Sequence, residues 1–509
     1  MDSEAVTKYS KLHAKPLGLF LQYGTAGFRY KAENLNHVMF RMGLLAVLRS
    51  KKTKSTIGVM VTASHNPEED NGVKLIDPSG EMLAPTWEEH ATFLANAEEP
   101  QLLCVLTEIC QKEAVDLQNK AFIVIGRDTR PSSKELSQAA IDGVSVLGGQ
   151  YKDYGLVTTP QLHYMVRCHN TQGTYGTPTV EGYYQKLSKA FLELTMQAAS
   201  QMDGRGGLKI DCANGIGALK LKEMEPHLSE SLAIHLANDG REGKLNHMCG
   251  ADFVKVHQKP PVGLQMNPGE RCCSLDGDAD RLVYYYVDTA GRFHLLDGDK
   301  IATLISTFLQ ELLVKAGQTL SFAVIQTAYA NGSSTSYLEQ TMKVLFSKAA
   351  EDKIRYQAKE EKDLQKREAA KMLENTIDLI NQTVGDGFSD MLVIEAILVL
   401  KNLTIAQWDA LYTDLPNRQL KVKVADRRVI STTDAERRAL APPGLQEKID
   451  HLTQKFKLAR AFVRPSGTED IVRVYAEADS QENADKLAHE VCLAVYHLAG
   501  GFGDLPKAV

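Results

Sequence analysis

The sequence predicts an α/β protein of several domains with parallel or mixed sheets. Three observations support this prediction. The chain has 509 residues, more than a single hydrophobic core usually serves. Apolar runs that end in polar, Gly-rich loops recur along it, and amphipathic stretches often follow them. The composition, with 43% hydrophobic and 24% charged residues, is that of a globular protein.

Strand–loop–helix units recur at three places in the chain. Residues 121–144 contain a strand-like FIVIG, a polar loop and then a helix that begins at a serine. Residues 208–224 and 321–343 follow the same plan. Folds of this kind place ligand sites at loops beyond the carboxyl ends of strands. The repetition also predicts domains that are built alike.

Helices and one hairpin dominate the last third of the chain. Residues 348–384 mix Lys, Glu and Ala without Gly or Pro, which predicts one long, mostly exposed helix. Residues 389–404 predict a second helix. Residues 457–478 predict strand, loop and strand, and residues 480–501 predict a closing amphipathic helix that stops at glycine.

Charge and cysteine content restrict the function class. A net charge of −6 provides no broad positive field, so we expect neither nucleic acid nor a membrane as partner. The eight cysteines lack C-x-x-C spacing, which predicts free thiols in a reducing compartment. Residues 1–15 lack the apolar core of a signal peptide, and no apolar run is long enough to span a bilayer. We therefore expect a cytoplasmic protein.

Three aspartates alternate with small residues in the stretch SLDGDADRLVYYYV, residues 274–287. Alternate residues of an extended segment face one way, so Asp276, Asp278 and Asp280 can converge on one hard cation. Without a cation, each carboxylate would raise the pKa of its neighbours. The loop is not an EF-hand, because Arg281 stands where that loop requires glycine. A divalent-metal site is favoured over an acidic surface loop.

A second polar loop lies between two predicted strands in RAFVRPSGTEDIVRVYAEA, residues 460–478. Its members are Arg464, Pro465, Ser466, Gly467 and Thr468. Backbone N–H groups, hydroxyls and a guanidinium suit a phosphate, and Arg473 follows in the second strand. The alternative is an ordinary hairpin turn.

Glycine-containing loops elsewhere are weaker signals. Residues 23–29 (YGTAGFR) combine flexible glycines with the fixed cation of Arg29. The loops at 127–133 (RDTRPSS) and 213–217 (ANGIG) follow predicted strands. Taken alone, each of these is as well explained by a structural turn.

The stretch VTASHNPEEDNG, residues 61–72, presents Ser64 as a candidate nucleophile. It is not the Gly-x-Ser-x-Gly turn of a hydrolase. His65 and Lys74 are the nearby polar side chains that could move a proton, and the local sequence fixes neither as the base.

These stretches together resemble the α-D-phosphohexomutase superfamily. GTAGFR, TASHNP, DGDADR and RPSGTED occur in the order of that family. Within it, the chain is similar to the eukaryotic phosphoacetylglucosamine mutases over almost its whole length. The resemblance implies three similar α/β domains and a C-terminal α+β domain around a central cleft. We place these domains at residues 1–180, 181–298, 299–410 and 411–509.

An activity follows from the resemblance. Such enzymes interconvert N-acetylglucosamine 6-phosphate and 1-phosphate, in UDP-N-acetylglucosamine biosynthesis, through a phosphoserine and a 1,6-bisphosphate. Ser64 is then implied to carry the phosphoryl group. Its oxygen and the three aspartates are implied to bind Mg²⁺. The expected partners are the sugar phosphate and the bisphosphate intermediate, and we expect a monomer.

The other candidate residues acquire roles from the same resemblance. Arg29 and Arg281 would stabilise charge on the transferring phosphoryl group. His65 or Lys74 would relay a proton to or from the sugar hydroxyl. The loop 464–468, with Arg473, is implied to hold the phosphate that is not reacting.

One feature of the resembled family is missing. Its third domain carries a sugar-contacting loop that reads like Glu-Ala-Asn-Gly-His-Gly, and no Glu-x-(Asn/Ser)-Gly-His occurs here. We infer a shortened third domain that lacks about thirty residues, including a strand, and is therefore less stable. A form that binds sugar phosphate or a partner without turnover is one alternative. A mutase for another hexose phosphate is the other, whereas a haloacid-type phosphatase would need Thr at Asp280.

Overall fold

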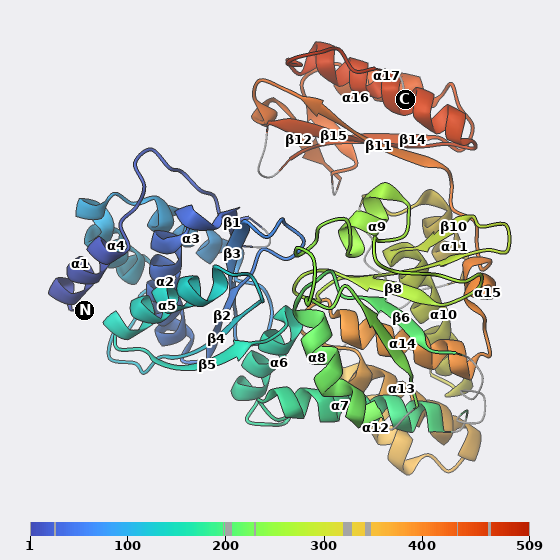
Figure 1. Cartoon of the computed structure of the whole chain (residues 1–509), viewed down its shortest axis with the longest axis horizontal. Helices are drawn as coiled ribbons and strands as arrows, with labels where there is room; N and C mark the ends of the chain where they lie inside the picture. The colour runs from blue at the N-terminus through green and yellow to red at the C-terminus, as the bar shows by residue number, and fades with distance from the viewer. Residues whose placement is uncertain are drawn as a thin grey trace. The chain divides into compact units, whose positions relative to one another are not determined.

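A computed structural model describes residues 2–24, 27–196, 198, 206–228, 231–318, 328–341, 348–434, 436–466 and 470–507 (Figure 1). The chain forms two compact units. Unit 1 comprises Met1–Gly298 and Lys353–Ala406, and unit 2 comprises Asp299–Asp352 and Gln407–Val509. The chain therefore leaves unit 1, returns to it and leaves it again.

The first sheet of unit 1 has five strands in the order β1–β3–β2–β4–β5. Their bounds are β1 (Phe28–Lys31), β2 (Ile57–Val61), β3 (Asp70–Ile76), β4 (Phe122–Arg127) and β5 (Gln150–Leu156). β3 is antiparallel to both β1 and β2, and β4 is parallel to both β2 and β5. All five residues of β2 are buried, which suits its apolar sequence IGVMV.

The second sheet of unit 1 repeats this pattern of directions in the order β10–β9–β8–β6–β7. Its strands are β6 (Leu208–Asp211), β7 (Ile234–Ala237), β8 (Cys272–Leu275), β9 (Leu282–Val287) and β10 (Phe293–Leu296). The β2–β3 loop carries Ser64, and the β8–β9 loop carries the three aspartates. These loops join corresponding strands of two similar sheets, so the predicted likeness of the domains is confirmed for these two.

Helices pack on both sheets of unit 1. They are α1 (Ser3–Leu12), α2 (Asn36–Thr53), α3 (Pro85–Asn96), α4 (Leu102–Lys112), α5 (Ser133–Val146), α6 (Thr159–Asn170), α7 (Val180–Thr195), α8 (Ile216–Met224) and α9 (Ala251–His257). α2 and α5 cross with their backbones in contact. A Cβ on Gly43 would lie 2.1 Å from the carbonyl oxygen of Ala140, and one on Gly143 would lie 2.0 Å from that of Phe40.

The prediction of one long, exposed helix over 348–384 is wrong. The segment forms α12 (Lys348–Glu360) and α13 (Leu364–Leu379), and Asp363 caps α13 by accepting the N–H groups of Gln365 and Lys366. α13 packs on α7 and buries apolar side chains such as Ala370 and Leu373. The many charged residues around this narrow apolar stripe concealed it in the sequence.

The returning segment of unit 1 ends in α14 (Gly387–Leu400), which is the predicted second helix. Asp386 caps it by accepting the N–H groups of Phe388 and Ser389. The N–H of Gly387 donates to the carbonyl of Ala279 at 3.0 Å, so the start of α14 supports the aspartate loop.

Unit 2 contains an antiparallel sheet in the order β11–β15–β14 and the hairpin β12–β13. The strands are β11 (Asn417–Lys423), β12 (Ser431–Thr433), β13 (Arg438–Ala441), β14 (Arg460–Pro465) and β15 (Ile471–Glu477). The helices are α10 (Gly298–Lys315), α11 (Gly332–Thr341), α15 (Ile405–Asp409), α16 (Leu445–Thr453) and α17 (Gln481–Leu498). The predicted hairpin and closing helix are confirmed. The predicted strand near 321–326 and residues 342–347 lie outside the described residues.

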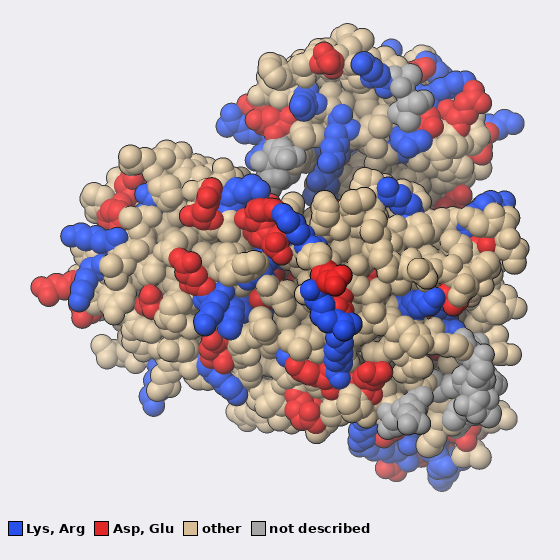
Figure 2. Space-filling model, in the orientation of Figure 1, with Lys and Arg blue, Asp and Glu red and all other residues tan. Residues whose placement is uncertain are grey.

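Acidic and basic side chains are interspersed on the face drawn in Figure 2. An anion site on this surface would therefore need a local cluster of cations. Within the described part of the chain, no helix is both long and apolar enough to cross a membrane.

We predict that Gly143→Ala destabilises the protein by about 1–3 kcal/mol, because the new methyl group must push α2 and α5 apart. Thermal or urea unfolding would measure the loss. Gly298→Ala is the control, since a Cβ at Gly298 meets nothing within 4 Å. Equal stability of the Gly143→Ala variant and the parent would contradict the close crossing.

Candidate active site

Ser64 lies fully buried in the loop after β2, and its hydroxyl donates to Asp276 Oδ2 at 2.7 Å. The two residues are far apart in sequence and lie in loops that follow strands of different sheets. Ser64 has a φ of 51°, a left-handed conformation that is uncommon for a residue other than glycine. Its N–H donates to the Thr62 hydroxyl at 3.0 Å.

Two side chains hold the backbone of the serine loop. Asn246 Nδ2 donates to the carbonyl oxygens of Ser64 and Asn66 at 2.8 and 3.0 Å. Arg130 Nη2 donates to the same two oxygens at 3.1 and 2.8 Å. Arg130 is itself fixed by a buried ion pair with Asp128. This clamp balances the strain of the left-handed serine and aims its hydroxyl at the aspartate loop.

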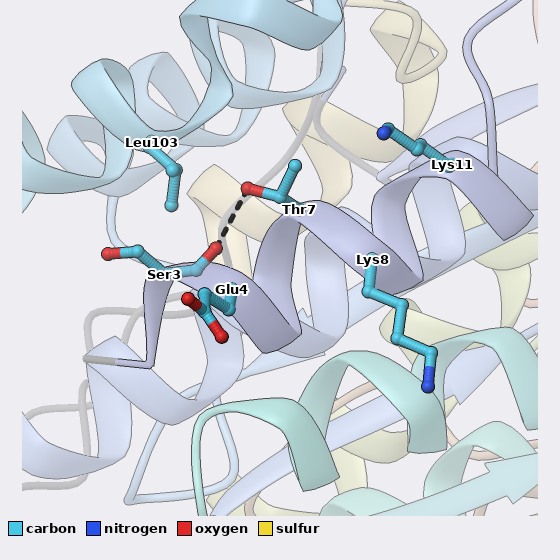
Figure 3. A pocket seen from close by; sticks show the side chains of 6 residues that line it. All are labelled: Ser3, Glu4, Thr7, Lys8, Lys11 and Leu103. Atoms are coloured by element: carbon cyan, nitrogen blue, oxygen red, sulfur yellow. Dashed lines mark hydrogen bonds between the residues drawn. The ribbon is translucent and has the colours of Figure 1, made fainter.

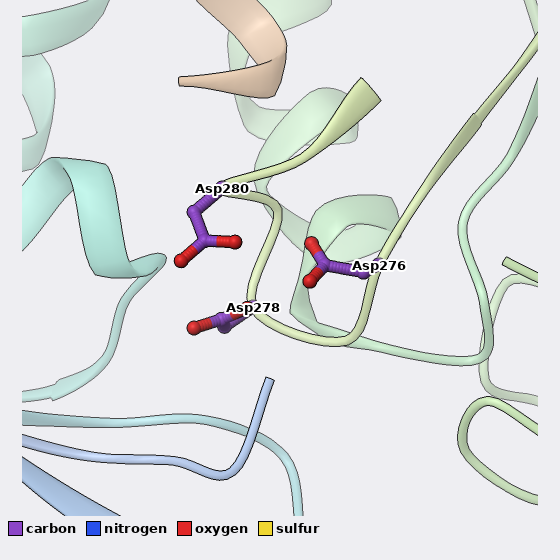
Figure 4. A group of neighbouring side chains, drawn as sticks. All are labelled: Asp276, Asp278 and Asp280. Atoms are coloured by element: carbon purple, nitrogen blue, oxygen red, sulfur yellow. The ribbon is translucent and has the colours of Figure 1, made fainter. Parts of the chain in front are cut away.

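The three aspartates converge as predicted (Figure 4). One carboxylate oxygen from each of Asp276, Asp278 and Asp280 lies within 4.8 Å of the others. The predicted reason is wrong, because the segment is a tight turn rather than an extended strand. Ala279 has a φ of 60°, and its N–H donates to the carbonyl of Asp276 at 3.1 Å.

The carboxylates are suited to a hard cation. Asp278 Oδ1 and Asp280 Oδ1 are buried and accept no hydrogen bond from any described residue. Burial, with the charges of Asp280 and Asp278, raises the pKa of Asp276 well above its usual range. Oxygen donors left without partners, in a group that repels itself, are what a divalent cation satisfies.

Lys74 lies buried beside the same carboxylates. Its Nζ is 3.3 Å from Asp278 Oδ2 and 3.1 Å from Asp280 Oδ2. Burial lowers the pKa of Lys74, but the charges of the two aspartates raise it by more than burial lowers it, so the pKa of Lys74 is raised overall. Lys74 is therefore a fixed ammonium at the edge of the candidate metal site.

Arg29, Arg281 and His65 surround the serine and the aspartates. Arg29 comes from β1, and its buried Nε has no hydrogen-bond partner among the described residues. Arg281 is partly exposed, with its Nε 3.9 Å from both Asp276 and Asp280. Burial, aided by Arg281, lowers the pKa of His65 to about 4, and its Nδ1 also lacks a partner within the described chain.

Sequence reasoning missed several residues that position this site. Thr159 is the first residue of α6, and its hydroxyl donates to Asp278 Oδ2 at 2.6 Å. Asp128 and Arg130 lie in the 127–133 loop, which the sequence alone explains equally well as a structural turn. Asn246 lies in an irregular segment where no local motif distinguishes it from a surface asparagine.

The predicted phosphate loop lies in unit 2. Arg464 and Pro465 end β14, Ser466 follows, and Arg473 lies directly opposite Arg464 in β15. Gly467 and Thr468 lie outside the described residues. Arg464 Nε is 2.9 Å from Glu436 Oε2, so this arginine already has an acidic neighbour.

A surface pocket of about 470 Å³ lies on α1, away from these residues (Figure 3). It is lined by Ser3, Glu4, Thr7, Lys8, Lys11 and Leu103. The Thr7 hydroxyl donates to the Ser3 carbonyl within the helix. These exposed groups do not converge on one point, and the pocket is not a candidate active site.

Four family models match the chain. Residues 44–102 and 104–175 match phosphoglucomutase/phosphomannomutase, alpha/beta/alpha domain I, and residues 420–494 match its C-terminal domain. Residues 174–283 match phosphoacetylglucosamine mutase AMG1, domain II. Residues 297–345 and 342–403 match domain III of that mutase.

Curated relatives match over the full length. The chain is 68% identical to human phosphoacetylglucosamine mutase, with 100% of this chain and 99% of the human protein covered. It belongs to the phosphoacetylglucosamine mutase family. The mutase of Candida albicans is 42% identical, with coverage of 96% and 98%.

Solved mutase structures share the fold. N-acetylphosphoglucosamine mutase of Aspergillus fumigatus in complex with GlcNAc-6P and magnesium has a TM-score of 0.91 and 44% identity, over 97% of this chain and 99% of that one. A Ser→Ala variant of it in complex with glucose 1,6-bisphosphate has a TM-score of 0.92 and 44% identity, over 98% and 99%. The predicted four-domain phosphohexomutase fold is confirmed.

Comparison with the mutase family also indicates where the third domain is shortened. The human alignment spans 540 positions against 509 residues here, so at least 31 positions have no residue in this chain. The two matches to domain III overlap at 342–345, which indicates that parts of the domain separated in other members adjoin here. The size and place agree with the inferred absence of about thirty residues from the third domain.

We predict that Asn246→Ala costs about 1–2 kcal/mol of stability, because the carbonyls of Ser64 and Asn66 lose a donor. We also expect less phosphoserine at Ser64 once its loop is free to move. Unfolding curves and intact-protein mass spectrometry would measure these effects. Asn267→Ala is the control, since its side chain makes an exposed bond to Glu270. Unchanged stability and phosphorylation would show that Arg130 alone suffices.

Proposed function

We propose that this chain interconverts N-acetylglucosamine 6-phosphate and N-acetylglucosamine 1-phosphate. The supporting observation is the buried Ser64 hydroxyl 2.7 Å from one of three convergent aspartates, in a member of the phosphoacetylglucosamine mutase family. A serine beside a carboxylate group of this kind suits phosphoryl transfer, which depends on positioning and charge neutralisation.

Mg²⁺ is the cofactor that these residues fit. Asp276, Asp278 and Asp280 would hold it together with an oxygen of phosphorylated Ser64, and the Oδ1 atoms of Asp278 and Asp280, which accept no hydrogen bond from the described residues, support this. When bound, the ion supplies positive charge that polarises the phosphoryl group.

The proposed cycle has three steps. The phosphoryl group on Ser64 passes to the free hydroxyl of the sugar monophosphate: the bond from phosphorus to the Ser64 oxygen breaks, a bond to the sugar oxygen forms, and the proton lost by the sugar hydroxyl is balanced by the one that the Ser64 oxygen takes up. The resulting 1,6-bisphosphate then turns over within the site. Its other phosphoryl group returns to Ser64, and the sugar oxygen that is released takes up a proton.

The chain's own groups divide the work of this cycle. Arg29 and Arg281 stabilise charge on the equatorial oxygens. His65 has an unpartnered ring nitrogen that can take the sugar proton, whereas Lys74 is held as an ammonium by two carboxylates and is the alternative proton relay. The clamp on the Ser64 carbonyl keeps the nucleophile aligned.

The loop Arg464–Thr468 and Arg473 are proposed to hold the non-reacting phosphate. A site that recognises only phosphate serves both orientations of the substrate. We further propose domains at 1–180, 181–298, 299–410 and 411–509, and a monomeric enzyme. Eight cysteines without a disulfide support a cytoplasmic location.

A second candidate function is sugar-phosphate binding without turnover. At least 31 aligned positions lack a residue here, and no Glu-x-(Asn/Ser)-Gly-His is present. Loss of sugar contacts would lower affinity and leave phosphoserine more open to water. The phosphoserine, aspartate and phosphate-loop motifs are all retained.

³¹P NMR of the purified chain tests the proposal, with Mg²⁺, N-acetylglucosamine 6-phosphate and a trace of the 1,6-bisphosphate. We expect a sugar 1-phosphate signal that Ser64→Ala abolishes, because no other residue replaces the phosphoryl acceptor. An unchanged spectrum from folded protein would support binding without turnover. Restoring the absent segment should then produce turnover and raise the melting temperature.

Asp280→Asn should weaken Mg²⁺ binding by about 100-fold, because one of three charged ligands becomes neutral. Titration calorimetry with Mg²⁺ would measure the change. Asp252→Asn is the control, since Asp252 is a partly exposed neighbour of Arg281 outside the aspartate group. Equal weakening by both substitutions would show a general effect of charge rather than a ligand role.

A further inference from the structure

The sheet β11–β15–β14 has two different faces. Residues such as Val472 and Val474 belong to the core that the sheet shares with α16 and α17. The opposite face carries three cations in one row, since Lys421 faces Arg473 and Arg473 faces Arg464. Residues directly opposite in antiparallel strands point to the same side, so the three side chains are neighbours.

This row of cations, Lys421–Arg473–Arg464, lacks sufficient negative charge of its own. Like charges directly opposite each other destabilise a sheet. Lys421 and Arg473 are exposed and form no ion pair with the described residues, while Arg464 pairs with Glu436 alone. A row that keeps this repulsion is suited to an anion that binds several cations at once.

Tyr329 covers the neighbouring row on the same face. Its ring centroid lies 5.1 Å from that of Phe462 and 5.9 Å from that of Tyr475. These two residues face each other one row from the cations. The Tyr329 hydroxyl is buried, with no well-formed hydrogen bond to a described residue. Burial raises its pKa, while nearby Arg464 and Arg473 lower it.

We propose that Lys421 and the Tyr329 hydroxyl bind the non-reacting phosphate of the sugar phosphate, together with Arg464 and Arg473. The identity of this ligand rests on the proposed function. Lys421 supplies a third cation from a different strand, and Tyr329 supplies a hydroxyl from the third-domain segment of the sequence. The site is thereby wider than the Arg-Pro-Ser-Gly-Thr loop.

Such a site explains how one anchor serves two substrate orientations. Its groups recognise a phosphate dianion and make no demand on the sugar ring. Because the anchored phosphate does not react, its contacts are the same in the ground state and the transition state. Losing one of them should raise KM and leave kcat nearly unchanged.

Calorimetric titration with N-acetylglucosamine 6-phosphate tests this proposal on the full chain. We expect Lys421→Met to raise Kd about tenfold and Tyr329→Phe about threefold. Lys421→Arg should keep Kd within about twofold of the parent, because it preserves the charge. Lys448→Met is the matched control, since Lys448 is an exposed lysine on α16, which packs against the other face.

Turnover and melting temperature distinguish this proposal from others. Where the chain turns over, KM should rise with Kd while kcat stays within about twofold. Without ligand, Lys421→Met should melt no lower than the parent, because removing a like charge relieves repulsion. Altered Kd without any turnover in the parent would reject the mutase function and still support this site.

Three outcomes would overturn the proposal. The first is Kd within twofold of the parent for both Lys421→Met and Tyr329→Phe. The second is equal weakening by Lys448→Met, which would indicate a diffuse charge effect. The third is the absence of binding by the parent at millimolar sugar phosphate.

Discussion

The hydrogen bond from Ser64 to Asp276 is the interaction on which the candidate site depends. It forms because Ser64 adopts a left-handed conformation after β2, which turns its hydroxyl toward the loop after β8. That conformation is unfavourable by itself and persists because Arg130 and Asn246 hold the adjoining carbonyls. Arg130 belongs to the domain of the first sheet and Asn246 to the domain of the second sheet, so both domains hold the backbone of Ser64 in place.

The sequence predicted the chemistry better than it predicted the supports. The aspartates stand out because their residue type and spacing carry meaning locally, whereas the roles of Ser64 and the arginine loop follow from the family resemblance. Thr159, Arg130 and Asn246 were not, because their roles arise only when distant segments meet. The spacing of the aspartates predicts that they are close but not the backbone conformation that brings them together. They converge through a turn at Ala279.

The fold shows the same limit. Strand–loop–helix units with continuous apolar strands were predicted correctly, as at β4–α5 and β6–α8. The segment 348–384 differs from its prediction, because the buried side of α13 mixes alanine, leucine and isoleucine with Asn375 and Thr376, and many charges surround this stripe in the sequence. The matched pattern of the two sheets was predicted only as a repeated plan, since strand order cannot be read from spacing.

The equivalent placement of the serine and aspartate loops has a consequence for how such a site is assembled. The two sheets share one pattern of strand directions, and each contributes the loop between corresponding strands. The β2–β3 loop carries the Ser64 hydroxyl, and the β8–β9 loop carries the three aspartates. Neither domain carries the complete set of catalytic groups, so the candidate site forms only where the two loops meet. The hydrogen bond from Ser64 to Asp276 therefore requires both domains to be folded and in contact.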